Sequence, residues 1–343
     1  MEQEHSSGCN LPISTVWSHE TDRLLYAIDE GVSGKIHNIA LISEFMAGRD
    51  DIVSKVSCIH PGRTVKITLT SYLEDISILT NTGDADIVIV ENCQFLYRRI
   101  IGGFQVLDSF IKLLCQKEKI WITTWNIHAW RYLHAVKDIG SIFPTQIVLK
   151  EKTNQELQEF ILSQQVSSVF YIIDTPVPRR LLVIKKLKKF TIPLLNIPFS
   201  FWYYSLRIRL IAALLRKKGH EIEPAELIFE RLAQISNGNP GIARKVWENT
   251  LDAWEIRLSR LTPPSLSGIS DPETAYTLSL IIALEDVQIH DLISVIPDDL
   301  NLDLILLKLR DMRLISFEGE RISIEPLALA GITREMKRIR MVW

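Results

Sequence analysis

The chain has 343 residues, of which 47% are hydrophobic and 23% charged, and its formal net charge is −2. A chain of this length and composition can bury more than one hydrophobic core, which predicts a globular protein of two or three domains. The near-neutral balance excludes a protein that is cationic throughout and binds nucleic acid or acidic membranes by overall charge. The four cysteines are widely spaced and form no C-x-x-C pair, so they indicate neither a zinc site nor a disulfide framework. We therefore expect a cytoplasmic protein.

The N-terminal half alternates strand and helix patterns. Residues 1–17 are polar, and we interpret them as a disordered lead-in rather than a secretory signal. Residues 22–29 (DRLLYAID) are expected to form a strand that ends in a Gly loop, and residues 35–48 place apolar residues at helical intervals. Further buried strands are predicted within DADIVIVEN, KIWITTWN and TQIVLK. The fold class expected for residues 18–150 is a P-loop α/β core with a parallel sheet.

The C-terminal half has a different pattern, in which helices predominate. Residues 151–258 are expected to form a helical lid domain, with a helix N-cap at Thr153 or Asn154 and a helix that begins at Pro240. Residues 259–272 have the composition of a linker. Residues 273–343 contain three helix patterns and a hairpin that turns at Gly319, which together predict a winged-helix domain.

The stretch IDEGVSGKIHN, residues 28–38, has features of a phosphate-binding loop. Such a loop needs glycines, whose backbone N–H groups converge on phosphates, then a lysine and a hydroxyl residue that ligates magnesium. Asp29 stands where the first glycine of that pattern belongs, and Ile36 stands in place of the hydroxyl. The alternative is an ordinary Gly turn between a strand and a helix. The hypothesis assigns nucleotide binding to Gly31, Ser33, Gly34, Lys35, Ile36 and His37.

Polar residues at the ends of two predicted strands are candidates for the remaining chemistry. Glu91 can hold the water shell of a magnesium ion, although it could instead cap the next helix. Asn92 stands where a water-activating acid would be expected, and an amide cannot accept a proton from water. Thr124 or Asn126 could touch a γ-phosphate or the attacking water, or could simply satisfy loop backbone groups. Fast nucleotide hydrolysis is therefore not expected.

A lid residue, Arg244, follows the SNGNPG junction in the first turns of a predicted helix. A guanidinium there could contact phosphates across the domain boundary. From the sequence pattern alone, Arg244 could equally be a surface charge.

The order of these segments resembles the AAA+ and STAND-like P-loop ATPases, notably the Orc1/Cdc6-like layout with a C-terminal winged helix. The resemblance covers residues 22–336 and is carried by GVSGK, DIVIVEN, IWITTWN and SNGNPGIAR. It implies ATP or ADP bound between core and lid, with Mg²⁺ near Glu91. It also implies that Arg98, Arg99 or Arg131 could reach a neighbouring subunit's nucleotide. The departures from the motifs make Walker A and Walker B degenerate, which predicts slow or absent hydrolysis and leaves open whether the protein is a weak ATPase.

Residues 175–220 contain eleven Lys and Arg residues and no acid, so the other 297 residues carry a net charge of −13. An uncharged aromatic run, FTIPLLNIPFSFWYYSL, lies within this basic segment. A membrane span is the least favoured interpretation, because the run has 17 residues and two prolines. The other interpretations are a peripheral membrane anchor, a surface that binds nucleic acid or protein, and an insertion packed into the lid, which we favour.

The expected winged helix is poorly suited to DNA. Its third helix pattern contains Asp303 and Asp311, and the hairpin tip carries Glu318 and Glu320, all of which repel phosphates. A protein partner or self-association is therefore favoured over nucleic acid. The leading hypothesis is a nucleotide-binding switch that acts through partner binding. The alternatives are a scaffold of the same fold that binds no nucleotide, and a DNA-associated initiator or mobile-element ATPase.

Overall fold

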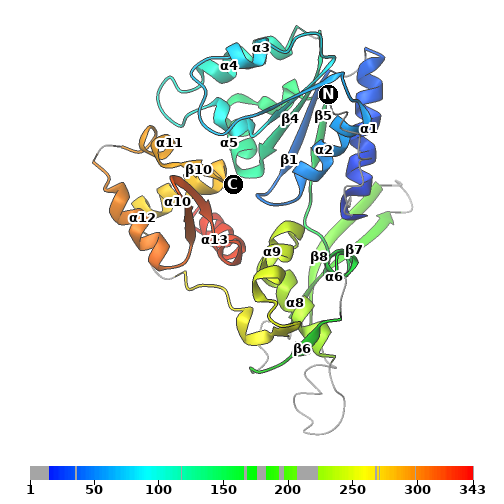
Figure 1. Ribbon diagram of the computed structural model, residues 1–343, viewed down its shortest axis with the longest axis vertical. Coiled ribbons are helices and arrows are strands. Elements are labelled where there is room, and N and C mark those ends of the chain that lie inside the picture. The colour runs from blue at the N-terminus through cyan, green and yellow to red at the C-terminus, as the bar shows by residue number, and fades with distance from the viewer. Residues whose placement is uncertain are drawn as a thin grey trace, which may run out of the picture.

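The computed structural model describes residues 15–34, 37–116, 118–165, 168–175, 183–192, 197–206, 223–266, 269, 271–297 and 299–342. Its centre is a five-stranded sheet with the order β2-β3-β4-β1-β5, in which every neighbouring pair is parallel (Figure 1). The predicted parallel α/β core is confirmed. The strands are β1 (Asn38–Ser43), β2 (Thr64–Thr68), β3 (Ile87–Glu91), β4 (Ile120–Asn126) and β5 (Thr145–Val148).

The first strand is not where the sequence pattern placed it. Residues 22–29 lie inside helix α1 (Ser18–Val32), and the predicted helix over residues 35–48 contains strand β1 instead. Both predictions are wrong. The apolar residues of α1 are spaced so that Leu24, Ala27 and Ile28 are buried along one helix face. The run NIALIS is buried at every position, as a central strand requires, and a short apolar run of this kind has no periodicity that separates strand from helix.

Helices cover both faces of the sheet. Alternate strand residues such as Ile39 and Leu41 pack with α1 and with α2 (Arg49–Ile59) in one cluster. The residues between them, Ala40 and Ile42, face the opposite cluster, which includes α4 (Gln105–Leu114) and α5 (Ile127–Lys137). Shorter helical turns are η1 (Thr15–Trp17), α3 (Ser77–Thr80), η2 (Cys93–Leu96) and η3 (Ile139–Ile142).

The second part of the chain is built on three helices, α6 (Asn154–Ser163), α8 (Pro224–Ser236) and α9 (Pro240–Thr250), as the sequence predicts. Thr153 caps α6, and its hydroxyl accepts a hydrogen bond from the backbone N–H of Glu156. Asn239 caps α9 ahead of Pro240. Two pairs of strands accompany these helices. The short strands β6 (Phe170–Ile172) and β9 (Glu255–Arg257) are parallel, and η5 (Leu258–Arg260) follows β9. The longer strands β7 (Val183–Ile192) and β8 (Ile197–Leu206) are antiparallel.

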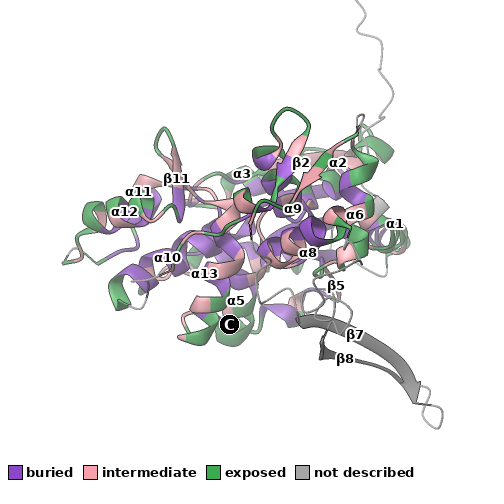
Figure 2. Ribbon diagram, turned by 90° about the horizontal axis from the view of Figure 1, so that it is seen from below, coloured by how far each residue is buried: buried purple, intermediate pink, exposed green. Residues whose placement is uncertain are grey.

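The last part contains the three predicted helices and the predicted hairpin. They are α10 (Pro272–Leu284), α11 (Ile289–Ile293), α12 (Leu302–Asp311) and the strands β11 (Ile315–Glu318) and β12 (Arg321–Ile324), with the two-residue strand β10 (Val287–Gln288) beside β12. A further helix, α13 (Pro326–Arg338), packs on α8 and α9, whereas α10 packs on α5. This C-terminal part therefore contacts both of the others (Figure 2).

The oxidation state of the cysteines differs from what the sequence predicted. Cys93 and Cys115 are free thiols, but Cys58 is disulfide-bonded, so the cysteines are not all reduced as expected. Among the described helices none is both long enough and apolar enough to cross a bilayer.

One buried histidine makes stability depend on pH. Burial, and then the positive charges of Lys337, Arg131 and Arg99, lower the pKa of His128 from 6.5 to about 3. The folded protein keeps this imidazole neutral, so His128 costs no stability above pH 6.5. As pH falls from 6.5 toward 3, only the unfolded chain takes up the proton, and stability is lost.

We expect His128→Gln to remove this loss. At pH 4.5 the wild type should lose roughly 1–3 kcal/mol more of its unfolding free energy, relative to pH 7.5, than the variant does. Urea unfolding at the two pH values measures the difference. Equal losses in the two proteins would show that His128 is not responsible.

Candidate functional site at the carboxyl edge of the sheet

The loop between β1 and α2 has the position of a phosphate-binding loop. It follows the first strand of a parallel sheet and leads into a helix N-terminus, where backbone N–H groups can meet an anion. Aligning the G-x-x-x-x-G-K-[ST] spacing with this loop puts Ser43 at the first glycine and Gly48 at the second. Arg49 then stands at the lysine position and Asp50 at the hydroxyl position. Gly48 has a φ of 90°, which its lack of a Cβ permits.

The loop proposed from the sequence lies elsewhere. Gly31 is in the last turn of α1, Ser33 and Gly34 form the turn after it, and Lys35 and Ile36 lie outside the described residues. His37 precedes β1, and its carbonyl accepts a hydrogen bond from the Trp121 N–H near the start of β4 at 2.7 Å. These residues are at the amino edge of the sheet. The predicted strand-loop-helix arrangement around them is therefore wrong, and Glu91 and Asn126 lie at the opposite edge.

A buried ion pair occupies the carboxyl edge. Nη1 of Arg49 donates to Oε1 of Glu285 at 2.8 Å, and Nη2 donates to Oε2 of the same carboxylate. The two side chains are only 10% and 5% exposed. Burial lowers the pKa of Arg49, but Glu285, Asp50 and Glu91 together raise it above its ordinary value, so the guanidinium stays charged. A bidentate pair of this kind is strong and geometrically specific, and here it joins positions 236 residues apart.

Two residues predicted from the sequence complete this cluster. Oδ1 of Asn92 accepts a hydrogen bond from Nη2 of Arg49 at 2.7 Å. Nδ2 of Asn126 donates to Oε1 of Glu285 at 2.9 Å and to the carbonyl of Ile282 at 3.0 Å. Oδ1 of Asn126 also caps α5. We call Arg49, Asn92, Asn126 and Glu285 the latch, because they join the sheet edge to the end of α10.

The other two candidates at this edge, Thr124 and Glu91, form hydrogen bonds or ion pairs with residues on or next to neighbouring strands. Oγ1 of Thr124 accepts a hydrogen bond from the Asn92 N–H at 3.0 Å. Glu91 is directed to β2, where it accepts a hydrogen bond from the Thr68 hydroxyl at 2.6 Å and pairs with Lys66 at 3.0 Å. The structure thus brings Asn92, Thr124 and Asn126 together, whereas the contacts of Glu91 are with β2.

Sequence reasoning missed both members of the ion pair. Arg49 was hidden because GRD is a poor match to the GK[ST] signature, and because the NIALIS run before it has no periodicity that distinguishes a strand from a helix. Glu285 carried no signal, since it is one acid at the end of an apolar helix. Its backbone is unusual, with φ 72° and ψ −86° at the C-cap of α10. Such a conformation costs about 1–3 kcal/mol outside glycine and is retained only when surrounding contacts hold it.

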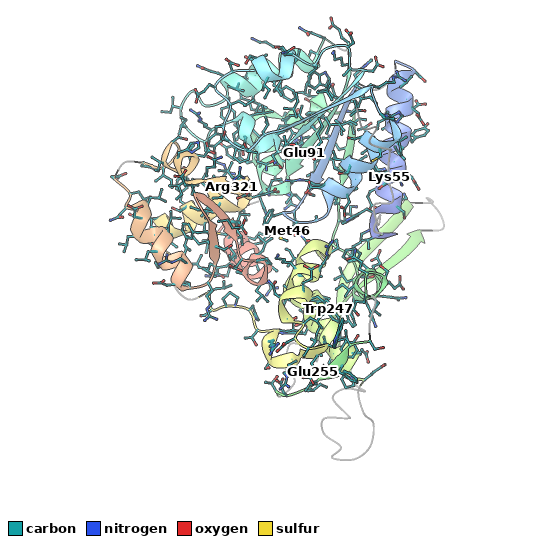
Figure 3. All side chains as sticks on the ribbon, in the orientation of Figure 1. Met46, Lys55, Glu91, Trp247, Glu255 and Arg321 are labelled. Atoms are coloured by element: carbon teal, nitrogen blue, oxygen red, sulfur yellow. The ribbon has the colours of Figure 1, made fainter. Side chains whose placement is uncertain are left out.

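The α9 helix closes over the β1–α2 loop. A Cβ added at Gly241 would lie 1.7 Å from the carbonyl oxygen of Met46, so the helix backbone and the loop backbone are in direct contact. Nδ2 of Asn239 donates to the Phe45 carbonyl at 2.8 Å, and Nε1 of Trp17 donates to the Ala47 carbonyl at 2.8 Å. Figure 3 shows Met46 where the sheet, α9 and the C-terminal part meet.

Two carboxyl groups beside this loop have raised pKa values. Burial, followed by the charge of Glu151, raises the pKa of Glu44, and Lys337 and Arg131 oppose this shift. Burial, followed by the charge of Asp50, raises the pKa of Asp51, which Arg244 opposes. In both groups burial is the largest cause, so the shifts report desolvation of the two carboxyls.

Little space remains beside the latch. The cavity that borders Asn92 and Glu285 has a volume of about 50 Å³. Small-molecule sites usually measure about 300–1,000 Å³. The arrangement holds the Glu285 carboxylate where an outside anion would otherwise meet Arg49.

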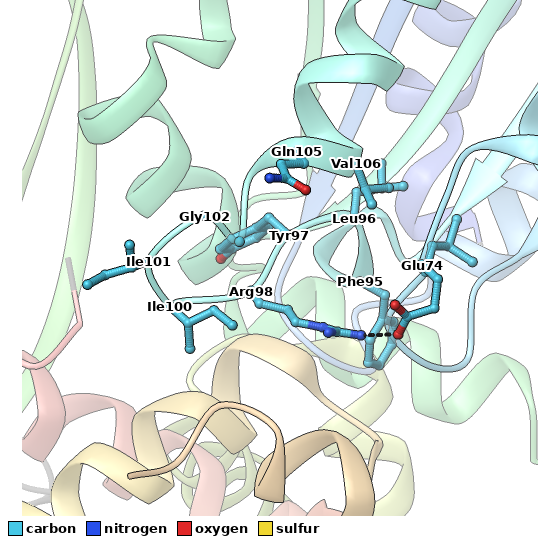
Figure 4. A pocket seen from close by; sticks show the side chains of 12 residues that line it. Glu74, Phe95, Leu96, Tyr97, Arg98, Ile100, Ile101, Gly102, Gln105 and Val106 are labelled. Atoms are coloured by element: carbon cyan, nitrogen blue, oxygen red, sulfur yellow. Dashed lines mark hydrogen bonds and ion pairs between the residues drawn. The ribbon is translucent and has the colours of Figure 1, made fainter.

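The predicted arginines have local partners. Arg244 pairs with Glu248 on its own helix at 2.8 Å. Arg98 pairs with Glu74 at 2.6 Å, beside a cavity of about 290 Å³ (Figure 4), and the guanidinium of Arg99 lies 4.4 Å from the Tyr132 ring centroid. The charge of Arg131 acts on Glu44 and His128. A contact with a neighbouring subunit's nucleotide remains a prediction for Arg98, Arg99 and Arg131.

No protein-family model matches the chain, and no curated protein sequence is similar to it. Similar solved structures include a RuvB mutant from Thermotoga maritima, with 13% identity, a TM-score of 0.40 and 94% of each chain covered. Cdc6p from Pyrobaculum aerophilum shares 12% identity over 95% of each chain, with a TM-score of 0.41. A STAND protein from Pyrococcus horikoshii shares 12% identity over 92% of this chain and 42% of its own, with a TM-score of 0.35.

The close approach of α9 to the loop gives a test by substitution. Gly241→Ala should lower the unfolding free energy by about 1–3 kcal/mol, because the new methyl group meets a backbone carbonyl that cannot rotate away. Gly331→Ala is the matched control, since its Cβ would meet only the side chain of Leu266 at 3.1 Å. Urea unfolding should show a smaller change for the control. An equal or smaller loss in Gly241→Ala would mean that α9 does not rest on the loop.

The latch predicts strong coupling between its two charges. Arg49→Leu and Glu285→Leu should each cost about 3–5 kcal/mol, since each leaves a buried charge unpaired, and the double variant should cost much less than their sum. The exposed pair of Arg63 and Asp86, which are 2.6 Å apart, is the control and should couple by less than about 1 kcal/mol. A double-mutant cycle by urea unfolding measures both. Additive losses at Arg49 and Glu285 would contradict a direct pair.

Proposed function

We propose that the protein is a nucleotide-independent scaffold with an ATPase-type fold that acts through binding to partners. The observation that carries this proposal is the buried pair of Arg49 and Glu285. Arg49 stands at the position where a P-loop protein uses a lysine on phosphates, and its charge is already neutralised inside the molecule. The pair instead holds α10, and with it the C-terminal part, against the sheet edge.

The surrounding residues support the same conclusion. Asp50, whose side chain is 81% exposed, adds a negative charge where the pattern has a magnesium-binding hydroxyl. The first turn of α9 contacts the loop through Gly241 and Asn239, which leaves the loop backbone covered. Asn92 cannot accept a proton from water, and Glu91 is engaged with Thr68 and Lys66. Neither residue at the end of β3, Glu91 or Asn92, is therefore available as a general base for hydrolysis.

The second candidate is the ATP or ADP switch that the resemblance implies. One observation favours it: the Arg49 guanidinium, from the first turn of α2, already holds an oxyanion, the Glu285 carboxylate. A nucleotide phosphate would have to displace that carboxylate and free the strained backbone at Glu285. Coordination of Mg²⁺ by Glu91 would belong to this second candidate.

Calorimetry decides between the two. Titrating the full chain with millimolar ATP or ADP, with and without Mg²⁺, should give no binding heat. Glu285→Gln is the informative variant, because it keeps the shape of the side chain but removes the charge that competes with phosphate. Arg49→Ala controls for binding elsewhere. Binding by the wild type that is lost in Arg49→Ala would refute the scaffold proposal and support the switch.

A further inference from the structure

The outer face of α12 is apolar and unpaired within the described part of the chain. Leu304 and Leu307, three residues apart and so on one helix face, are 62% and 45% exposed. Asp303 and Asp311 are exposed beside them, and neither forms an ion pair with any residue that the structure describes. We call Asp303, Leu304, Leu307 and Asp311 the α12 face. The opposite side of α12 buries Ile305, Leu306 and Leu309 in the core, so Leu304 and Leu307 lie on its solvent side.

The region that carries this face is acidic. Residues 286–321 contain eight acids and four bases. Two of these bases are already used, since Lys308 lies 3.8 Å from Asp271 and Arg321 pairs with Asp286 at 2.7 Å. A partner for this region should therefore be cationic and should offer apolar side chains to the leucines.

The chain itself contains a segment of that chemistry. Residues 175–220 have eleven cations, no acid, and an aromatic run between the two basic clusters. The cations of this segment complement the acids of the α12 face, and its aromatic run complements the exposed leucines. Phosphate-bearing partners are disfavoured at the α12 face by the same acids that attract this segment.

The segment and the face lie on different sides of one molecule. Figure 1 places strands β7 and β8 on the opposite side of the molecule from α12. The described pairing of β7 with β8 over ten residue pairs fixes this part of the segment as a hairpin. An encounter between the hairpin and the α12 face is therefore easier between two copies than within one.

We propose that the α12 face binds residues 175–220 of a second copy of this chain. The inference deepens the proposed scaffold function by naming its partner. Because the two surfaces differ, the contact is head-to-tail, and it builds chains or rings rather than closed two-fold dimers. The attraction combines burial of Leu304 and Leu307 with charge pairing that salt weakens.

The test is sedimentation velocity on the full chain from micromolar to high micromolar concentration, at low and at high salt. The wild type should self-associate, and high salt should weaken the association. Leu304→Ser with Leu307→Ser should raise the dissociation constant about 10- to 100-fold. The matched control is Ile59→Ser with Val136→Ser, two exposed apolar residues on α2 and α5 that are 46% and 51% exposed. This control should associate like the wild type.

A mixing experiment separates a head-to-tail contact from other assemblies. A second variant reverses the charge of four cations: Lys185→Glu, Lys186→Glu, Lys188→Glu and Lys189→Glu. The leucine variant keeps an intact residue 175–220 segment, and the lysine variant keeps an intact α12 face. Neither variant should therefore assemble alone. In an equimolar mixture the intact segment of one should bind the intact face of the other, which gives a one-to-one complex that cannot grow further.

Several results would overturn the inference. They are a wild type that stays monomeric at every concentration, self-association that the Leu304 and Leu307 changes leave unaltered, and an equimolar mixture that forms no complex. Binding of duplex DNA that those leucine changes weaken would assign the face to nucleic acid instead. None of these readouts involves nucleotide, so a failure here leaves the calorimetric test of the scaffold proposal intact.

Discussion

The arrangement of this molecule depends on one buried ion pair. Arg49 begins the helix after β1, and Glu285 ends α10, so their contact joins the sheet to the C-terminal part. Two buried charges are costly to desolvate, and they are tolerated here because each also has an amide partner, Asn92 or Asn126. Removing one of the two charges would leave the other buried in a low-dielectric interior without a partner of opposite charge. The pair therefore specifies how the parts meet.

The same contact decides the chemistry of the sheet edge. In a parallel α/β sheet, the carboxyl ends of the strands and the following helix N-termini form the usual ligand site. Here that site is filled from within by a carboxylate, by the first turn of α9 and by the side chain of Trp17. The parallel strand order is kept although the carboxyl edge of the sheet is filled from within the molecule.

The sequence predicted much of the candidate site but misplaced its most important loop. Asn92, Thr124 and Asn126 were identified because each lies at the end of an apolar run that predicts a buried strand, and such positions can be recognised from the local sequence. The GVSGK signature was misleading, since glycines near a lysine also occur where a helix ends and a strand begins. Arg49 was not identified because the phosphate-loop pattern requires a lysine at its position. No local pattern could pair it with Glu285, which lies 236 positions away.

The sequence by itself determined the parallel α/β core except for its first strand, the helices α6, α8 and α9, and the helices α10 to α12 with the hairpin that follows them. Apolar periodicity, N-caps such as Thr153 and turn residues such as Gly319 act over a few neighbours, and so they can be read locally. Only the tertiary structure decided which loop lies at the functional edge and what fills it. That outcome depends on a carboxylate from one end of the chain reaching a guanidinium near the other, because desolvation makes each charge require the other.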